Sequence, residues 1–259
     1  MQLKKISIQL LCQEPGMIKG HAGTELHGLF FKALENADGE LASELHQMQY
    51  KPFIIGPLIG KIQRRDGIAQ IEEGNVYSFT LATLVEKLTV IVPDVLEYFQ
   101  KTLLVIGSAG FTYLSAKEVT DKRTYYDFMA IRNQDSRINI EFTTPTCFRR
   151  SGRALLFPEP ELVFGSLIEK WEYFSEIQLP ILDLSQVNVT KYDLKTTLVQ
   201  FNNYNMIGFS GKCTYTFAKD STEVTKWAIN SLAQFATLSG VGYKTTMGMG
   251  QVKIYTNNK

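Results

Sequence analysis

The sequence has few of the residues that cross-link small secreted domains. Its 259 residues include 3 cysteines, Cys12, Cys147 and Cys213, which lie far apart and form no CxxC pair. This pattern argues against a disulfide framework and suits a reducing cytoplasm. No apolar run approaches the roughly 20 residues of a membrane-spanning helix, and the first apolar run is too short and too polar for a signal peptide. We therefore expect a soluble, cytoplasmic protein with no membrane contact.

The sequence also lacks an excess of charge of either sign. Lysine and arginine total 27 against 26 aspartate and glutamate, so the formal net charge is +1. Such a chain has no global field that would attract a nucleic acid or a membrane, and any anion-binding site must be local. Hydrophobic residues make up 44% of the chain, which is enough to bury a core and excludes a largely disordered protein.

Histidine is scarce, with three residues, His21, His27 and His46. His21 and His27 are six positions apart, so they cannot share a helix face as zinc ligands do, and no metal centre is expected. Histidine titrates near neutrality and can move protons without a metal. His46 is predicted in a polar loop before Tyr50 and Lys51, where a cation could stand beside an anionic substrate, and His27 flanks an apolar helical stripe. Both are candidates for acid–base chemistry.

The hydrophobic pattern gives the order strand, helix, strand, strand, helix, strand in each half of the chain. In the first half we predict strands at 3–10, 51–55, 76–81 and 111–119 and helices at 22–36 and 84–101, with an irregular basic connection at 61–75. In the second half we predict strands at 138–143, 188–202, 206–217 and 251–255 and helices at 161–174 and 222–239. A turn is expected at 202–205, and Asp220 and Ser221 are the predicted caps of the last helix.

This order is that of the ferredoxin-like motif. The sequence therefore predicts an α+β protein of two tandem ferredoxin-like (RRM-like) domains, residues 1–118 and 119–259. Each domain would be a four-stranded antiparallel sheet with helices on one face.

The strongest local pattern is GVGYKTTMGMG at 240–250, between the last predicted helix and the last strand. Four glycines in eleven positions indicate positive φ angles or a close approach of the backbone to something bulky. Outward-facing amides would form an anion nest, to which Lys244 and two threonines would add donors. The spacing is not that of a nucleotide-binding fingerprint. The glycines are Gly240, Gly242, Gly248 and Gly250, and a tight helix-to-strand connection is the alternative.

Basic residues cluster at 61–65 and at 148–153. Short charge runs are usually solvated surface. The second cluster, however, joins an aromatic residue and a glycine to Arg149, Arg150 and Arg153, directly after a predicted strand. Arginine with an aromatic neighbour suits phosphate contact and base stacking, so this cluster is a candidate RNA-binding segment.

Three blocks, in order, resemble the CRISPR-associated endoribonucleases of the Cas6 type, in the RAMP superfamily. The loop at 240–250 is similar to the family's C-terminal glycine-rich loop. Leu45-His46, followed by Lys51-Pro52-Phe53 and Pro57-Leu58, resembles the stretch that holds its catalytic histidine. The segments 142–146 and 148–149, with Trp171 and Phe174, resemble its mid-chain block.

The resemblance implies an activity and its partners. These are metal-independent cleavage of precursor CRISPR RNA, no cofactor, and binding of CRISPR repeat RNA. The 2′-hydroxyl would attack the neighbouring phosphate and leave a 2′,3′-cyclic phosphate and a 5′-hydroxyl. Arg149, Arg150, Arg153, Lys244 and the four glycines would hold the RNA. Subunits of a CRISPR effector complex and a homodimer are further candidate partners.

The resemblance also implies a catalytic set. His46 would be base or acid and Lys51 the nearby cation. Some members add a tyrosine on the first helix, but the position that aligns with it here is Phe31, which cannot transfer a proton. We therefore expect His27 to supply the second group, with Tyr50 as the alternative. Two rival functions are a non-catalytic RAMP-type RNA-binding subunit of an effector complex and a nucleotide-binding ferredoxin-like protein, the latter disfavoured because no motif cradles a triphosphate.

Overall fold

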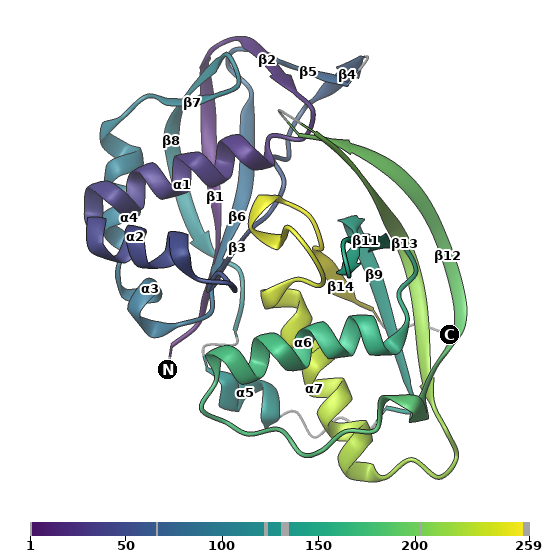
Figure 1. Ribbon diagram of the computed structural model, residues 1–259. Coiled ribbons are helices and arrows are strands. Elements are labelled where there is room, and N and C mark those ends of the chain that lie inside the picture. Colours follow the sequence, from purple (N-terminus) through teal and green to yellow (C-terminus); the bar gives the residue numbers. More distant parts are fainter. Residues whose placement is uncertain (1, 66, 122–123, 131–134, 202–203, 256–259) are drawn as a thin grey trace.

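The N-terminal half is a five-stranded antiparallel sheet with helices packed on one face (Figure 1). The computed structural model describes residues 2–65, 67–121, 124–130, 135–201 and 204–255. The strands, in sheet order, are β3 (Phe53–Ile55), β6 (Val76–Thr83), β1 (Lys4–Glu14), β8 (Ala109–Glu118) and β7 (Leu104–Ile106). Alternate residues of β1, Ile6, Ile8 and Leu10, are buried beneath the helices, as the period-2 pattern predicts.

The helices of this half are α1 (Gly23–Ala37), α2 (Gly39–Gln47), α3 (Glu86–Val90) and α4 (Val92–Lys101). The buried stripe of α1 includes Leu26, Phe30 and Leu34, which repeat every three to four residues as a core-facing helix requires. Pro93 lies in the first turn of α4, where its missing amide hydrogen costs no helical hydrogen bond. It therefore starts a helix, and the predicted 84–101 segment is two helices.

The C-terminal half is a second antiparallel sheet. Its strands, in sheet order, are β12 (Val187–Gln200), β13 (Asn205–Phe217), β9 (Arg137–Thr146) and β14 (Val252–Ile254). Its helices are α5 (Tyr125–Met129), α6 (Pro160–Phe174) and α7 (Glu223–Ser239). Side chains of α6 and α7, among them Phe164, Trp171 and Phe235, pack with the inner face of the sheet in one hydrophobic cluster.

Each half has the ferredoxin-like topology. Counting the strands of the βαββαβ unit from one to four, both sheets run in the order two, three, one, four. The fold class predicted from the sequence is confirmed, with one correction. The first sheet has a fifth strand, because β7 pairs with β8 through a hairpin of Leu104–Ile106 with 109–111. Nothing in the structure tests the exact domain boundary near residue 118, which stays a prediction.

Local corrections concern the connections. The 61–75 segment, predicted irregular, contains β4 (Gln63–Arg65) and β5 (Ile68–Ile71), which form a small sheet with β2 (Gly16–Lys19). Thr222, rather than Asp220 or Ser221, caps α7, since its side chain accepts a hydrogen bond from the amide of Thr225. The predicted turn at 202–205 includes residues 202 and 203, which lie outside the described residues.

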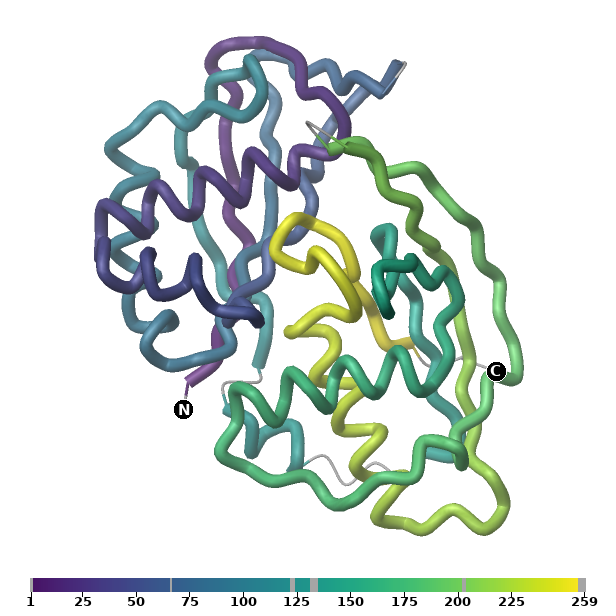
Figure 2. The backbone as a smooth tube through the Cα atoms, viewed as in Figure 1, coloured from purple at the N-terminus to yellow at the C-terminus, as the bar shows by residue number. Residues whose placement is uncertain are grey.

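The glycine-rich loop lies between the two halves. It is the yellow loop near the centre of Figure 2, and its segment Thr245–Met247 contacts β3 and α1. A small buried cluster, Cys147, Val199, Phe201 and Met249, packs the end of β12 against this loop. In the described part of the chain, no helix has the length and apolar character needed to cross a membrane.

Candidate active site

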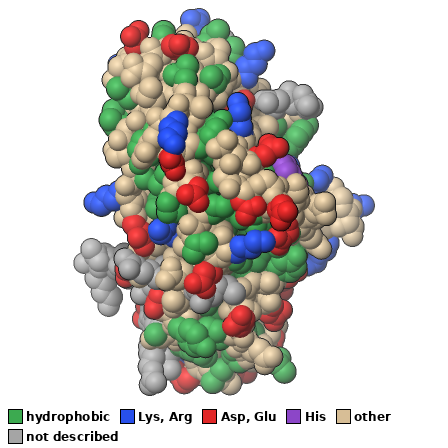
Figure 3. Space-filling view, turned by 90° about the vertical axis from the view of Figure 1, so that its left-hand side faces the viewer, with side chains coloured by type: hydrophobic (Ala, Val, Ile, Leu, Met, Phe, Trp, Pro, Cys, Tyr) green, Lys and Arg blue, Asp and Glu red, His purple; other side chains and the backbone are tan. Residues whose placement is uncertain are grey.

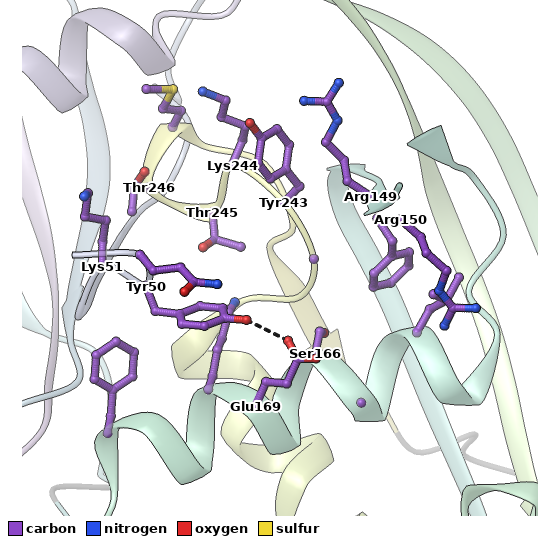
Figure 4. A pocket seen from close by; sticks show the side chains of 18 of the residues that line it. Tyr50, Lys51, Arg149, Arg150, Ser166, Glu169, Tyr243, Lys244, Thr245 and Thr246 are labelled. Atoms are coloured by element: carbon purple, nitrogen blue, oxygen red, sulfur yellow. Dashed lines mark hydrogen bonds between the residues drawn. The ribbon is translucent and has the colours of Figure 1, made fainter. Parts of the chain in front are cut away.

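A cleft of about 550 Å³ opens between the two halves of the chain (Figure 4). One wall comes from His27 of α1 and from the segment 49–51, which leads into β3. The opposite wall comes from β10 (Phe148–Arg150), α6 and the glycine-rich loop from Gly242 to Met247. Segments that are far apart in sequence therefore meet at one cavity.

The glycine-rich loop has the conformation that its glycines predict. Gly240, Gly242, Gly248 and Gly250 all have positive φ angles, between 61° and 82°, in a region that other residues rarely adopt. At Gly250 a larger residue is also excluded by lack of space, because a β-carbon would lie 2.1 Å from the carbonyl oxygen of Val241. The four glycines therefore specify the path of the loop. The predicted anion nest is not tested by the structure.

A buried lysine holds the start of this loop. Lys170 of α6 donates from Nζ to the carbonyl oxygens of Ser239 and Gly240, each at 3.0 Å. These carbonyls end α7, where a cation satisfies groups that lack helical partners. Burial lowers the pKa of Lys170 to about 7. Sequence analysis missed this residue, although its place between Leu167 and Trp171 on the buried side of α6 was a usable signal.

His27 lies in the cleft and contacts the glycine-rich loop. Its Nδ1 is 3.3 Å from the carbonyl oxygen of Thr246. Because a carbonyl only accepts hydrogen bonds, Nδ1 carries the proton in the neutral ring and Nε2 keeps a free lone pair. Burial, the largest cause, lowers the pKa of His27 to about 4, with smaller contributions from the charges of His46, Lys244 and Lys51. At neutral pH the ring is therefore an uncharged acceptor at Nε2.

His46 is exposed in the last turn of α2, not in a loop as the sequence predicted. Leu41 and Leu45 face the core, so this short amphipathic helix was hidden by its polar composition. The ring of His46 stacks on Phe31, with centroids 3.9 Å apart, and Phe31 in turn contacts the ring of His27 at 4.9 Å. The two histidines thus flank one phenyl ring, although His46 is not among the residues lining the cleft.

Lys51 closes the end of α2. Its Nζ donates to the carbonyl oxygens of His46 at 2.9 Å and Met48 at 2.6 Å, so it fixes the turn that carries His46. Tyr50, the alternative proton-transfer group, donates its hydroxyl to Glu169 at 2.9 Å. That hydrogen bond, the largest cause, raises the pKa of Tyr50, which makes its hydroxyl less suited to proton transfer near neutrality.

The predicted RNA-binding cations divide into two groups. Arg149, Arg150 and Lys244 line the cleft, whereas Arg153 does not. The segment 148–153, predicted as a loop, is a hairpin of β10 with β11 (Arg153–Leu155), turned by Ser151 and Gly152 at positive φ, the pattern of a tight two-residue β-turn. On the face seen in Figure 3, acidic and basic side chains are interspersed without a continuous basic stripe.

The first basic cluster has a structural role. Lys61 pairs with Glu72 at 3.0 Å, and Arg64 donates to the carbonyl oxygen of Gly20.

His21, which the sequence does not assign to the site, lies close to the glycine-rich loop, since a β-carbon at Gly248 would be 2.9 Å from its ring. Neither ring nitrogen of His21 has a hydrogen-bond partner in the described part of the chain.

The fold and the cleft define a protein of two tandem ferredoxin-like domains with histidines and cations gathered between them. A sequence model of the family described as CRISPR-associated endoribonuclease Cas6 matches residues 140–252. A curated CRISPR-associated endoribonuclease Cas6 of Streptococcus thermophilus is 25% identical over 236 residues, covering 89% of this chain and 90% of that protein. One of Mycobacterium tuberculosis is 30% identical over 128 residues, covering 48% and 40%.

Solved structures agree on the fold. A product complex of a Cas6 protein from Thermus thermophilus has a TM-score of 0.81 at 24% identity, covering 98% of this chain and 100% of that one. A product complex of a second Cas6 protein has a TM-score of 0.78 at 24% identity, covering 99% and 100%. The resemblance read from the motifs is confirmed: the matches support a Cas6-type CRISPR endoribonuclease and a place in CRISPR RNA processing.

Proposed function

We propose that the protein binds CRISPR repeat RNA and cleaves precursor CRISPR RNA without a metal. The observation that carries this proposal is the contact of His27 with Thr246. It puts a neutral imidazole, with a free Nε2, against the glycine-rich loop in a cleft that also holds Lys51, Lys244 and Arg149. The named activity of the curated relatives supports the same reaction class.

In the proposed reaction, the 2′-oxygen forms a bond to the adjacent phosphorus and the bond from phosphorus to the 5′-oxygen breaks. The products are a 2′,3′-cyclic phosphate and a 5′-hydroxyl. A base must take the proton of the 2′-hydroxyl and an acid must give one to the leaving 5′-oxygen, and each such group contributes about 10²- to 10⁴-fold to the rate. No oxidant, reductant or metal is needed for this balance.

We assign the base to His27. Its Nδ1–H is held by Thr246, so Nε2 is the atom that accepts the proton. The lowered pKa of His27, about 4, keeps Nε2 unprotonated at neutral pH. A bound phosphate brings negative charge close to the ring and raises this pKa, which strengthens the base when the substrate is in place.

We assign the acid to His46 and electrostatic stabilisation to two lysines. His46 is close enough to His27 for its charge to lower the pKa of His27, and the Phe31 stack orients its ring. Lys51, bound to the carbonyl of His46, and Lys244, in the loop, supply positive charge where the phosphorane develops negative charge. Arg149 and Arg150 would bind the backbone phosphates beyond the cut.

Single-turnover cleavage of a repeat RNA in EDTA tests the assignment. His46→Ala and His27→Ala should each slow cleavage by about 10²- to 10⁴-fold with little change in RNA affinity, and the 5′ product should carry a 2′,3′-cyclic phosphate at its 3′ end. Wild-type rates for both variants would refute the roles assigned to the two histidines. Loss of wild-type activity when EDTA is added would refute metal independence.

A second candidate is a non-catalytic RNA-binding subunit of a CRISPR effector complex. Phe31 favours it, because this position offers no hydroxyl beside His46. On this reading the wild-type protein binds repeat RNA tightly and leaves it uncut in the same assay. Effector subunits as partners, a homodimer and a cytoplasmic location stay predictions.

A further inference from the structure

A row of aromatic rings and cations begins at the cleft, which Arg149, Tyr243 and Lys244 line, and continues beyond it. The guanidinium of Arg149 lies 5.2 Å from the ring centroid of Tyr243, and Nζ of Lys244 lies 5.4 Å from the same centroid. The same Nζ is 5.6 Å from the ring of Tyr204, which stacks on Phe201 at 4.9 Å and 17°. Figure 4 shows Lys244, Tyr243 and Arg149 side by side. We call these five residues the aromatic rail.

Backbone hydrogen bonds hold the rail at Tyr243 and at Phe201. Tyr243 donates its amide hydrogen to the carbonyl of Cys147 at 2.9 Å, and Phe201 does the same to the carbonyl of Tyr204. Phe201 is buried in the cluster that joins β12 to the glycine-rich loop. These hydrogen bonds and this packing fix the backbone beside Tyr243 and Phe201, which lowers the entropic cost of binding a partner to the rings.

Packing in the hydrophobic core does not explain four residues of the rail, Tyr204, Tyr243, Arg149 and Lys244. Tyr204 is 44% exposed and Tyr243 is partly exposed. Among the described residues, neither hydroxyl has a hydrogen-bond partner, and Arg149 and Lys244 have no carboxylate within salt-bridge distance. These groups are thus available to a ligand with flat apolar faces and negative charge.

We propose that the aromatic rail stacks unpaired bases of the RNA strand next to the cleavage site. This inference rests on the proposed function and adds the form of the substrate. Every base has a face that stacks on an aromatic ring, and arginine or lysine beside the ring can pair with the neighbouring phosphate. In a duplex the base faces are covered by their neighbours, so the rail selects a single-stranded segment.

The rail is also close to the proposed chemistry. Lys244 and Thr246 are two positions apart, so even a fully extended chain would separate their α-carbons by only about 7 Å, and Thr246 contacts His27. A base stacked on Tyr243 would therefore belong to a nucleotide near the scissile phosphate. Stacking would hold the ribose in register with Nε2 of His27.

Affinity measurements with a short unstructured RNA and a fully paired RNA of equal length test the proposal. Tyr243→Leu and Tyr204→Leu should each weaken binding of the unpaired RNA by about 5- to 100-fold and leave the duplex within about twofold. Tyr243→Phe and Tyr204→Phe should bind like wild type, because stacking needs the ring and not the hydroxyl. Tyr126→Ala is the matched control, since Tyr126 is 73% exposed on α5.

Three results would overturn the proposal. The first is an unchanged affinity of both leucine variants for the unpaired RNA. The second is a loss of affinity in the phenylalanine variants as large as that in the leucine variants. The third is a loss of affinity for the duplex as large as that for the unpaired RNA. Tyr204 is exposed enough that its replacement need not disturb folding, which a thermal melt would check. Because the probe RNA contains no CRISPR repeat, this result is independent of cleavage: a protein that fails to cut repeat RNA can still show the ring-dependent binding.

Discussion

The ring of His46 stacks on the ring of Phe31 with centroids 3.9 Å apart and an interplanar angle of 24°. Phe31 is buried, 6% exposed, and its ring also contacts those of His27 at 4.9 Å, Phe53 at 5.6 Å and Phe30 at 6.0 Å. An exposed histidine on a short helix would otherwise rotate freely, so this single contact fixes the orientation of His46 relative to the cleft.

Phe31→Leu should therefore slow cleavage by misorienting His46. We expect a loss of roughly 10-fold or more in rate, unchanged RNA affinity, and a stability cost below about 1.5 kcal/mol because the volume is nearly conserved. Phe31→Tyr keeps the ring and should retain at least the wild-type rate. Single-turnover kinetics measures both, and a leucine variant as fast as wild type would show that the stack has no catalytic role.

Gly250 and Gly28 form a matched pair. Alanine at Gly250 would put its β-carbon 2.1 Å from the carbonyl of Val241, at a φ of +70°, so the variant should lose RNA binding and about 1–3 kcal/mol of stability. Gly28, in α1, has nothing within 4 Å of an added β-carbon. Gly28→Ala should instead stabilise the protein by about 0.5–1 kcal/mol. Chemical denaturation reports both values, and equal effects would contradict the description of the loop.

Lys170 should make stability depend on pH above neutrality. Its pKa is about 7 in the folded protein and 10.5 in the unfolded chain, so between these values the unfolded state binds more protons. The free energy of unfolding therefore rises with pH over this range. From pH 7 to pH 9 the wild type should gain about 2 kcal/mol relative to Lys170→Met. Urea titrations at the two pH values measure the difference, and parallel pH profiles would place Lys170 in a more solvated site than the structure shows.

His21 should make stability depend on pH in the same direction, but on the acid side of neutrality. Burial, the larger cause, and the charge of Arg64 lower the pKa of His21 to about 4 from 6.5. Between those values the unfolded state binds more protons, so stability falls as pH falls. From pH 7 to pH 5 the wild type should lose about 2 kcal/mol more than His21→Leu. The denaturation midpoints at these pH values provide the measurement, with His46→Ala as a control because His46 is exposed.

The prediction from sequence succeeded where the pattern was long and local. The helices at 22–36, 161–174 and 222–239 were placed within a residue or so of α1, α6 and α7, because a continuous apolar stripe specifies a helix whatever it packs against. It failed for β4, β5 and β7, which have three or four residues each. Such strands exist only through pairing with a distant partner, which periodicity does not reveal.

For the candidate site, residue type and spacing named His27, His46 and the glycine-rich loop as candidates, because scarce histidines and dense glycines are visible in the chain itself. The family resemblance added the role of Lys51, and the functions of all these residues stay predictions. The contact of His27 with Thr246, 219 positions away, was decided only by the packing of the two halves. The stack of His46 on Phe31 and the burial of Lys170 against the end of α7 were decided by the packing of helices within each half. Local sequence sets which elements can form, whereas charge, burial and proton affinity at a site depend on which distant elements are brought against it.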